Sequence, residues 1–437
     1  MFERVLKIAL VAACAIALFG ITACEIPAVG EQVAAPQISL ESGVYYGPQE
    51  VTITCEDGDA TIRYTTDGSN PGETAGTLYE GPFQINYGCT VKAIACKPNK
   101  RPSVIPAGSY TIPLVITSGN YDNGTTDIPC YWLGNVRTDL PIDGVLGGNG
   151  TESYPYAGSI YTSGYYWIPY PEGAGTLQIP CYWRNTTRVD LFSPTDGYDG
   201  NANAIMVING TVYTAGSYDD GSGSYKPCYW INTTRYDLEI PGNWAMVNDL
   251  FVSNGIVYTC GSYATTEGQM IPCYWTGTFK TDLPGNADMY TGAFGIFISG
   301  QTVFTSGHLW DGSKIFPCYW VGTNRTDLSG DGVHHAGARR LFVYNGTIYT
   351  SGMYSDGSQF IPCYWTGTVK TDLPGASGDL LHVSGAYDIC VSIGTVYTAG
   401  MWYDGSKHVA CYWTDTTRTD LPADGSAHAV ANTIYMY

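Results

Sequence analysis

Charged side chains are scarce in this sequence. They make up 14% of the 437 residues, and 20 Lys and Arg stand against 39 Asp and Glu. The resulting net charge of −19 argues against a surface for nucleic acid or anionic membrane, because both need clustered basic side chains. The repeated part of the chain also lacks the 3.6-residue apolar period of helices. Helical enzymes and DNA-binding proteins are therefore poor fits.

Catalytic motifs are missing as well. The sequence has no Gly-x-Ser-x-Gly, no His-Glu-x-x-His, no phosphate loop and no sialidase-type Asp box. What the chain does have is 54 Gly, 24 Pro and an aromatic content of 14%. Enough aromatic and β-branched side chains are present to build a core, which argues against disorder. The composition predicts an acidic all-β protein without cofactor and without catalytic activity.

The first 23 residues read as an export signal. Arg4 and Lys7 precede the uncharged apolar run Ile8–Ile21, which is too short for a confident spanning helix. The run ends in Ile21-Thr22-Ala23-Cys24, which resembles the lipobox of bacterial lipoproteins. This resemblance implies that Cys24 is lipidated and that residues 24–35 are a tether. The alternative is an ordinary signal peptide in which Cys24 is incidental.

Residues 36–112 predict a small β-sandwich. Val51–Cys55, Thr61–Thr65 and Thr90–Ala95 alternate as strands, and Asp57-Gly58 and Asp67-Gly68 mark turns. Ser42-Gly43-Val44-Tyr45, Tyr64-Thr65-Thr66-Asp67-Gly68-Ser69, Leu78-Tyr79-Glu80-Gly81-Pro82 and Val91-Lys92-Ala93-Ile94-Ala95 closely resemble the C-terminal domain of chitobiase and β-hexosaminidase. The resemblance implies an accessory Ig-like module outside the cytoplasm, with no catalytic residues. Cys55, Cys89 and Cys96 suffice for one disulfide, whose pairing the sequence leaves open.

Residues 113–437 are dominated by one repeat. The tripeptide Cys-Tyr-Trp occurs seven times at intervals of 45 to 51 residues, a period typical of propellers and solenoids. In one unit we expect four strands, at Leu250–Ser253, Ile256–Tyr263, Ile271–Trp275 and Phe279–Leu283. Four short strands per repeat predict a seven-bladed β-propeller.

The two ends of the repeat region predict how the ring closes. Leu114–Gly119 aligns with the second strand of a unit, and the C-terminal stretch from His428 aligns with the first strand and its turn. We therefore expect the C-terminal strand to complete the first blade, which removes an open edge. Ile434–Tyr437 has no certain place in this alignment. An incomplete eighth blade is the alternative.

Most repeated residues predict scaffold. We expect the Trp of each Cys-Tyr-Trp to fill the core between blades, and the Cys to be a buried free thiol. The alternative for the Trp residues is a set of exposed sugar-stacking rings. The fourth strand carries a basic residue two positions before an Asp in every unit, which predicts ion pairs: Arg137/Asp139, Arg188/Asp190, Arg235/Asp237, Lys280/Asp282, Arg325/Asp327, Lys370/Asp372 and Arg418/Asp420.

The longer loops predict the binding face. They join the fourth strand to the next first strand and the second strand to the third, so they leave one end of the propeller, and variable loops on a rigid scaffold are the usual place for binding. All six His residues map to that end. The predicted ligand-binding residues are the aromatic side chains that fall in or beside these loops: Tyr165, Tyr166, Trp167, Tyr170, Trp244, Trp310 and Trp402. An equal alternative is that these aromatic and His residues have no common function. Residues that are not part of the repeat must fall in the loops, where the repeat sequence is not maintained.

The sequence therefore predicts a non-catalytic lipoprotein of the bacterial cell envelope, monomeric and anchored through Cys24. It would lie at the outer membrane or its periplasmic face, or at the cell surface. Its propeller rim is expected to bind a glycan or another ligand. The alternatives are an adhesive scaffold for envelope or host proteins and, further off, a glycan-processing enzyme. The Asp-Gly-Ser loops at Asp311, Asp356 and Asp404 are expected to be ordinary turns rather than calcium sites, and no metal site is predicted.

Overall fold

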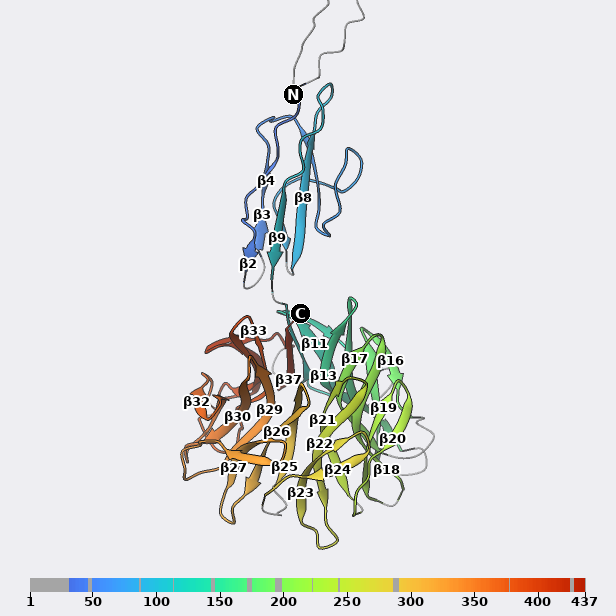
Figure 1. Ribbon diagram of the computed structural model, residues 1–437, viewed down its shortest axis with the longest axis vertical. Coiled ribbons are helices and arrows are strands. Elements are labelled where there is room, and N and C mark those ends of the chain that lie inside the picture. Colours follow the sequence, from blue (N-terminus) through green and yellow to red (C-terminus); the bar gives the residue numbers. More distant parts are fainter. Residues whose placement is uncertain are drawn as a thin grey trace, which may run out of the picture. The chain divides into compact units, whose positions relative to one another are not determined.

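The computed structural model describes residues 31–45, 49–85, 88–112, 114–142, 146–170, 175–192, 199–221, 223–242, 244–285, 291–376, 378–424 and 428–436. All regular structure in these ranges is β-strand (Figure 1). Within them no helix has the length and apolar character needed to cross a membrane. The chain divides into two compact units, one ending at Ile112 and one beginning at Pro113. Cys24 lies outside the described residues.

The first unit is a small β-domain. Its main sheet has the strand order β2-β9-β8-β5-β6, and the pairs β1-β4 and β3-β7 accompany it. Val51, Val91 and Tyr110 form the centre of its core, and the Tyr110 hydroxyl donates to the Leu40 carbonyl at 2.9 Å. The strands are β1 Gln37–Ile38, β2 Gly43–Val44, β3 Gln49–Val51, β4 Ile53–Thr54, β5 Thr61–Thr65, β6 Thr77–Leu78, β7 Phe83–Ile85, β8 Cys89–Cys96 and β9 Ala107–Thr111.

The expectation of a disulfide in this domain is wrong. Cys55, Cys89 and Cys96 are all free thiols. Cys89 and Cys96 stand at the two ends of β8, and a strand of that length separates its ends far beyond the roughly 7 Å that a disulfide spans. The Cys55 thiol instead donates to the Ala34 carbonyl at 3.3 Å.

The described part of the second unit forms seven four-stranded antiparallel sheets. They are blade 1 (β10 Val115–Asp122, β11 Asp127–Leu133, β12 Val136–Asp139, with β37 Ala429–Met436), blade 2 (β13 Gly147–Tyr156, β14 Ser159–Pro169, β15 Thr176–Arg184, β16 Thr187–Asp190), blade 3 (β17 Gly200–Ile208, β18 Thr211–Asp219, β19 Tyr225–Ile231, β20 Thr234–Asp237), blade 4 (β21 Ala245–Ser253, β22 Ile256–Ala264, β23 Met270–Thr276, β24 Phe279–Asp282), blade 5 (β25 Gly292–Ser299, β26 Thr302–Trp310, β27 Ile315–Val321, β28 Asn324–Asp327), blade 6 (β29 Ala336–Tyr344, β30 Thr347–Ser355, β31 Phe360–Thr366, β32 Val369–Asp372) and blade 7 (β33 Gly385–Ser392, β34 Thr395–Tyr403, β35 His408–Thr414, β36 Thr417–Asp420).

Local sequence explains the tight turns and the strand lengths. Asn254-Gly255 joins β21 to β22 with positive φ at both residues, as the hairpin turn favoured by Asn-Gly requires. The first strand of the blade is longer than expected, Ala245–Ser253 instead of Leu250–Ser253. It carries a β-bulge between Val247 and Asp249, which breaks the period-two pattern that marks a strand in sequence.

The ring closes as expected, with β37 paired to β10 in blade 1. The expected turn after the first strand is absent, because Asn432 forms the bulge, Thr433 pairs with Ser118 and the strand continues to Met436. Ile434 therefore belongs to β37, and Tyr437 lies outside the described residues. The Ile434 amide donates to Asp388 of blade 7 at 2.8 Å, which joins the last blade to the first.

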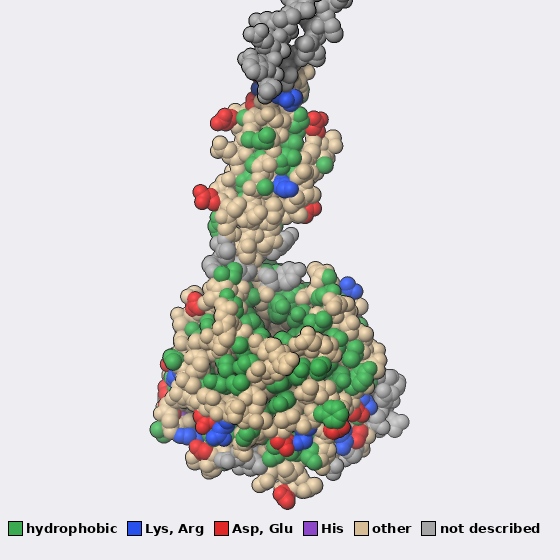
Figure 2. Space-filling view, in the orientation of Figure 1, with side chains coloured by type: hydrophobic (Ala, Val, Ile, Leu, Met, Phe, Trp, Pro, Cys, Tyr) green, Lys and Arg blue, Asp and Glu red, His purple; other side chains and the backbone are tan. Residues whose placement is uncertain are grey.

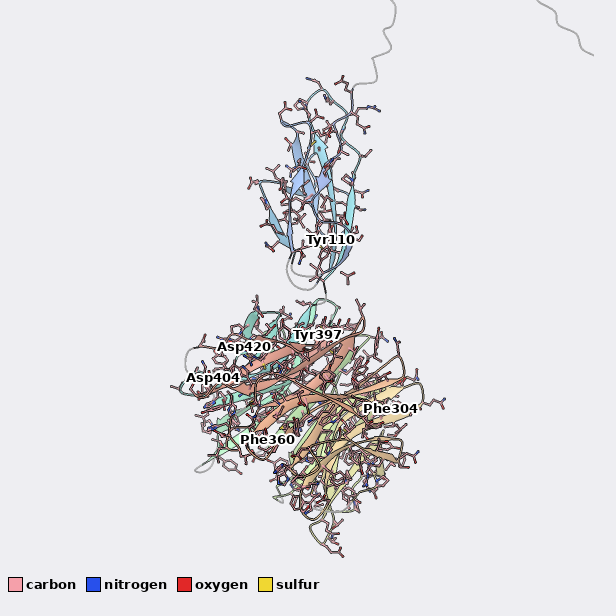
Figure 3. The ribbon with its side chains drawn as sticks, turned by 90° about the vertical axis from the view of Figure 1, so that its left-hand side faces the viewer. Tyr110, Phe304, Phe360, Tyr397, Asp404 and Asp420 are labelled. Carbon is pink, nitrogen blue, oxygen red and sulfur yellow. The ribbon has the colours of Figure 1, made fainter. Side chains whose placement is uncertain are left out.

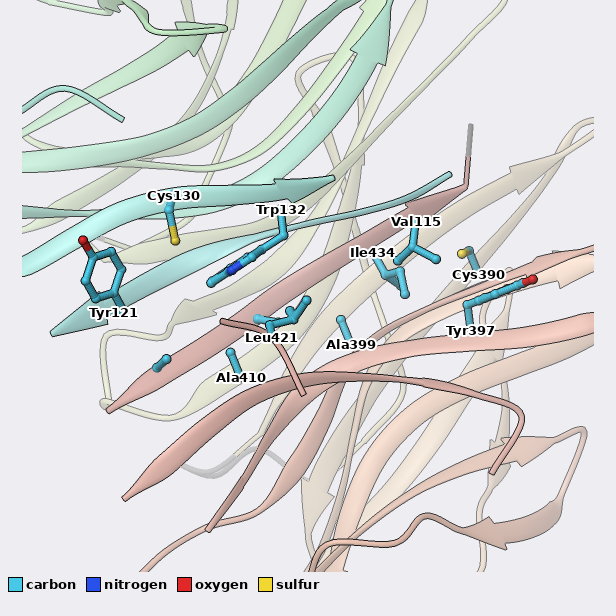
Figure 4. Close-up of a cluster of buried hydrophobic side chains, with 12 residues drawn as sticks. Val115, Tyr121, Cys130, Trp132, Cys390, Tyr397, Ala399, Ala410, Leu421 and Ile434 are labelled. Atoms are coloured by element: carbon cyan, nitrogen blue, oxygen red, sulfur yellow. The ribbon is translucent and has the colours of Figure 1, made fainter. Parts of the chain in front are cut away.

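The Cys-Tyr-Trp tryptophans fill the spaces between blades, as predicted. Each is 0% exposed: Trp132, Trp183, Trp230, Trp275, Trp320, Trp365 and Trp413. The Trp132 indole N–H donates to the Pro422 carbonyl across the closing interface at 2.9 Å, and Figure 4 shows the ring between β11 and Leu421. The Trp320 indole makes the equivalent bond to Pro284 at 3.0 Å. The accompanying cysteines are buried free thiols, also as predicted.

The predicted ion pairs of the fourth strand form in all seven described blades, and an aromatic ring of the blade lies beside each basic residue. In blade 3 the Arg235 guanidinium lies 3.8 Å from the centre of the Tyr218 ring, and the Tyr218 hydroxyl donates to Asp237 at 3.3 Å. The pairs are partly exposed, so each contributes little by charge alone. The repeat therefore uses an aromatic, basic and acidic trio as scaffold on the outer half of each blade.

Figure 2 shows one face of the propeller, with β21, β22, β26 and β29 in view. Apolar side chains predominate over this face, and charged side chains gather along its lower margin. The distribution follows from the composition: with so few charged residues, apolar atoms must cover much of the surface.

Candidate functional site

The bulge in the first strand of each blade marks equivalent positions around the central channel, from which three layers of residues can be defined. It lies at the same place in all seven described blades. We call the bulge residues the loop-side layer: Thr151, Asn203, Asn248, Phe294, Arg339, Tyr387 and Asn432. The residues that follow form the middle layer: Glu152, Ala204, Asp249, Gly295, Arg340, Asp388 and Thr433. Two positions further on is the turn-side layer: Tyr154, Met206, Phe251, Phe297, Phe342, Cys390 and Tyr435.

In four blades the loop-side layer is scaffold. Asn203 Nδ2 donates to the Val247 carbonyl of the next blade at 2.6 Å, and Asn248 Nδ2 donates to the Ala293 carbonyl at 2.8 Å. Asn432 and Thr151 make the equivalent bonds at 2.9 and 2.6 Å. A short polar side chain at the bulge thus ties each of these blades to its neighbour.

Blades 5, 6 and 7 depart from this pattern, because their bulge residues are Phe294, Arg339 and Tyr387. The Arg339 guanidinium lies between the two rings, 5.2 Å from the centre of Phe294 and 5.7 Å from that of Tyr387. Three adjacent blades therefore replace an inter-blade hydrogen bond with a cation held between two aromatic faces.

Arg339 has no counter-ion among the described residues. No carboxylate of these residues pairs with it, and its buried Nε has no hydrogen-bond partner. Burial lowers the pKa of Arg339, but an arginine starts so high that it remains charged. Burial also raises the pKa of Tyr387 to about 12, so this phenol stays neutral. The single fixed charge of the loop-side layer is positive.

A cavity of about 490 Å³ opens at this layer, which we call the channel mouth. It is lined by Asn203, Asn248, Phe294, Arg339, Arg340, Tyr387, Met401, Val430 and Asn432. Its volume lies within the usual range of ligand sites, and its lining mixes apolar rings with a few polar groups, as such sites do. The lining contains no described Asp or Glu.

A second cavity, of about 440 Å³, adjoins the channel mouth and shares Arg339 with it. We call it the side groove. Its lining residues come from blades 5 and 6: His308, Trp310, Ile315, His335, Ala336, Gly337, Arg339, Met353 and Phe360 (Figure 3 labels Phe360). The Trp310 and His335 rings are stacked, with centres 5.9 Å apart and planes 18° apart. The groove is mostly apolar and leads from this ring pair towards Arg339.

His308 stands between the two cavities as a neutral group. Its ring stacks on Phe294 with centres 4.6 Å apart. Burial, reinforced by the nearby Arg339 charge, lowers the pKa of His308 to about 3. His308 therefore carries no charge at neutral pH and does not compete with Arg339 for an anion.

The middle layer closes the channel below the mouth. The Arg340 guanidinium pairs with Asp249 and lies 3.6 Å from Glu152. Burial raises the pKa of Glu152 to about 7, although Arg340 acts in the opposite direction. Burial likewise raises the pKa of Asp388. Glu152 and Asp249 also accept backbone N–H bonds from the next blade, at 3.1 and 2.8 Å, so this layer joins blades as well as plugging the axis.

The turn-side layer is apolar and surrounds a smaller cavity of about 220 Å³ beyond Arg340. Phe297 contacts Phe251 and Phe342, with ring centres 4.9 and 5.1 Å apart. Between blades 1 and 2 the Tyr154 and Tyr435 rings are in contact, with centres 5.1 Å apart. The polar groups that line this cavity are Glu152, Asp249, Arg340 and Asp388 of the middle layer, and Arg340 is paired with Asp249.

The predicted ligand-binding residues are distributed over four blades. Trp310 lines the side groove. Tyr165 and Trp167 contact each other in blade 2, with ring centres 5.3 Å apart. Tyr170 is exposed at the end of that hairpin, and Trp244 is half-buried just before β21. The structure does not gather these rings into one platform.

Two of the predicted residues are scaffold. Tyr166 is 2% exposed, lies under Arg188 at 4.0 Å and donates to Asp190 at 3.1 Å. Trp402 occupies the same repeat position in blade 7, where its indole N–H donates to Asp420 at 3.0 Å. Tyr166 was predicted to bind ligand, but the structure buries its side chain, because strand alternation turns this position towards Arg188 and Asp190 of its own blade.

The residues that sequence reasoning missed are Phe294, Arg339 and Tyr387. The signal was present: once the repeats are aligned on their first strands, these residues replace Asn203, Asn248 and Asn432. The alignment on Cys-Tyr-Trp alone did not expose it, because spacing between first strands and that tripeptide varies from blade to blade.

The other polar clusters at this end have local partners. Asp311, Asp356 and Asp404 each accept bonds from the Ser backbone N–H and hydroxyl two residues later, at 2.7 to 2.9 Å. These are ordinary Asx turns, as expected. No group of three or more metal-binding side chains occurs among the residues that the structure describes. His408 and His428 form a pair, with their Nδ1 atoms 3.1 Å apart.

Comparison with known proteins gives a partial match in sequence. Residues 51–110 match the family described as Fn3 associated. An endoglucanase of Clostridium saccharobutylicum is 52% identical over 40 residues, which are 9% of this chain and 9% of that protein. The chain thus matches less than a tenth of the length of that relative.

Several solved structures are similar in fold. A quinonprotein alcohol dehydrogenase-like protein from Bacteroides thetaiotaomicron is 10% identical, with a TM-score of 0.38, over 91% of this chain and 98% of that one. TolB from Acinetobacter baumannii is 10% identical, with a TM-score of 0.41, over 74% and 83%. The Aleuria aurantia lectin is 8% identical, with a TM-score of 0.35, over 72% and 94%. The chain is therefore all-β: a small β-domain that matches the Fn3-associated family over residues 51–110 precedes seven four-stranded sheets, whose own topology is that of a β-propeller.

Proposed function

We propose that the propeller is a non-catalytic binding unit that holds a glycan in the side groove and the channel mouth. The observation that carries this proposal is that Arg339 lines both cavities. The Trp310–His335 ring pair lines one of them, and the other lies at the axis of the propeller. Aromatic faces suit the C–H faces of sugar rings, and the polar groups at the inner end suit their hydroxyls.

Binding fits these cavities better than hydrolysis does. Glycoside hydrolysis uses two carboxyl groups that flank the scissile bond. Neither the channel mouth nor the side groove is lined by a described Asp or Glu. The carboxylates of the middle layer are engaged with Arg340 and with backbone N–H groups, which leaves them poorly placed to act on a bound sugar.

We further propose that the protein works at the bacterial envelope, anchored by lipid on Cys24. The Fn3-associated module, which resembles the chitobiase C-terminal domain, would act as a spacer between the anchor and the propeller. Mass spectrometry of the mature chain tests the anchor. Acylation at Cys24 is the expected result, and an unmodified chain that starts elsewhere would rule the anchor out.

The binding proposal is tested with a glycan array probed by the full chain in a mild detergent. We expect binding to a defined set of oligosaccharides and its loss in Trp310→Ala. Phe279→Ala is the matched control, because Phe279 is 70% exposed at the start of β24 in blade 4 and lines neither cavity. Both variants are checked for unchanged thermal unfolding. Full retention of binding by a folded Trp310→Ala protein would exclude the side groove.

A protein partner at the same rim is the second candidate. It is favoured by two large apolar side chains on the loops beside blades 6 and 7, since Val333 is 69% exposed and Leu381 is 87% exposed. Exposed apolar groups of this kind are common at protein contacts. A protein binder would lose its partner on Leu381→Asp while Trp310→Ala remained active, and a glycan binder would show the reverse.

A further inference from the structure

We infer that Arg339 anchors an anion-binding subsite at the channel mouth and that the ligand bound there carries a carboxylate, as a uronic acid does. This inference rests on the proposed function, since it specifies the class of glycan held at the same site. It starts from the departure of blades 5 to 7 from the repeat. The side-chain hydrogen bond that four other blades make to their neighbour is replaced at Arg339 by contacts with two rings, which leave its charge without a carboxylate partner among the described residues.

The charge balance of the site points to an anion. The Arg339 guanidinium has two aromatic neighbours and no carboxylate partner among the described residues, and its Nε is buried without an acceptor. Burying such a charge is costly unless an acceptor completes its hydrogen bonds. Arg340, one residue later, shows the contrast: it faces Asp249 and Glu152 and is fully compensated. A bound anion would give Arg339 the negatively charged partner that Asp249 and Glu152 give Arg340.

A carboxylate fits better than a phosphate. One guanidinium offers two parallel N–H bonds, which match the two oxygens of a single carboxylate. The rest of the mouth offers no further positive charge for a doubly charged group, since Arg340 is already paired and His308 stays neutral. Asn203 and Asn248 use their Nδ2 atoms in the scaffold, so their Oδ1 atoms are left to accept from hydroxyls. Carboxylate, hydroxyls and C–H faces occur together in a uronic acid.

Non-specific attraction would not produce the same result. The whole chain carries a net charge of −19, and its long-range field repels anions. Acidic sugars should therefore bind only where a local cation selects them. A preference for acidic over neutral sugars would therefore report binding at Arg339 in the channel mouth.

The test uses matched acidic and neutral sugars. Uronate-containing oligosaccharides are printed beside their methyl esters and probed with the full chain, and affinities of the hits are measured by calorimetry. We expect the acids to bind about 10- to 100-fold more tightly than their esters, as a charged hydrogen bond implies. Arg339→Gln should abolish this difference, and Arg339→Lys should restore part of it, because lysine keeps the charge but not the paired geometry. Arg325→Gln, which removes the same charge from an outer strand, should leave it intact.

The outcomes separate this inference from the proposed function. Equal binding of acids and esters, with both lost in Trp310→Ala, would refute the carboxylate subsite and leave glycan binding in place. An acid preference that survives in a folded Arg339→Gln protein would refute the role of Arg339. Absence of binding to every printed sugar would overturn both proposals. Since Arg339 makes no ion pair with the described residues, its removal should not lower the unfolding temperature, which is measured in parallel.

Discussion

Replacing Arg340 by methionine should destabilise the propeller in a strongly pH-dependent way. The positive charge of Arg340 balances the negative charges of Asp249 and Glu152 in the middle layer. Its charge also lowers the pKa of Asp388, against the larger effect of burial. The Asp249 side chain is 6% exposed, and that of Arg340 is 14% exposed. Removing one partner of a buried ion pair typically costs about 3–5 kcal/mol. At pH 8 we expect that loss in Arg340→Met.

The sign of the pH effect follows from the carboxyl groups. Burial raises the pKa of Glu152 from 4.5 to about 7, so between these values the folded protein binds more protons than the unfolded chain. Stability is therefore greatest at the acidic end of this window and falls as the pH rises through it. Without Arg340, the pKa values of Glu152 and Asp388 rise further. These two protonated groups no longer need a cation at pH 5, so the loss caused by Arg340→Met should be smaller at pH 5 than at pH 8.

Thermal unfolding followed by circular dichroism between pH 5 and 8.5 measures this difference. A domain of the size of residues 113–437 has an unfolding entropy of about 0.7 kcal/mol/K, so a loss of 3–5 kcal/mol lowers Tm by about 4–7 °C. Arg325→Met, at an exposed pair, should change Tm by about 1 °C or less at any pH. Adding Asp249→Asn to Arg340→Met should recover part of the loss. An equal loss at pH 5 and pH 8 would show that Arg340 acts by packing, and the charge argument would fail.

Two further predictions concern the scaffold. Trp320→Phe should cost about 1–2 kcal/mol in urea unfolding, because it strands the Pro284 carbonyl, whereas Trp320→Ala should cost about 3–5 kcal/mol; equal costs for the two variants would contradict a role for the indole N–H. Burial raises the pKa of every described propeller cysteine, Cys181 and Cys228 among them. These thiols should resist Ellman's reagent until the protein unfolds, and fast labelling of the native propeller would argue against such burial.

The fold was largely predictable because its signals are local and repeated. Cys-Tyr-Trp and the strands around it occur in seven copies, and tight Asn-Gly turns occur in three of them, so the copies reinforce a single interpretation. The first strand was the exception. Its bulge places polar residues such as Asn248 and Asp249 inside a strand, and in sequence the Asn432-Thr433 pair looks like a turn.

The site was harder to predict, because it is built from blades that are distant in sequence. Phe294, Arg339 and Tyr387 are about 45 residues apart and meet only around the channel. Aromatic content near loops drew attention to the rim instead. There, Trp310 lines a cavity, whereas Tyr166 completes a repeated structural trio. Position near a loop therefore did not distinguish candidate binding residues from structural ones. A residue that differs from the repeat at a position lining the channel was the better indicator of the candidate site.

The place of β37 in blade 1 has a consequence for how the protein matures. The partner strand of β10 in the first sheet is β37, which follows it by more than 300 residues in the sequence. One edge of β10 therefore stays unpaired until β37 has been synthesised. Non-local pairing of this kind is slow and exposes a strand edge meanwhile. The other blades can assemble in order, but the ring cannot close until β37 pairs with β10. A chaperone that covers the unpaired edge of β10 during that interval would protect this protein from pairing with the wrong strand.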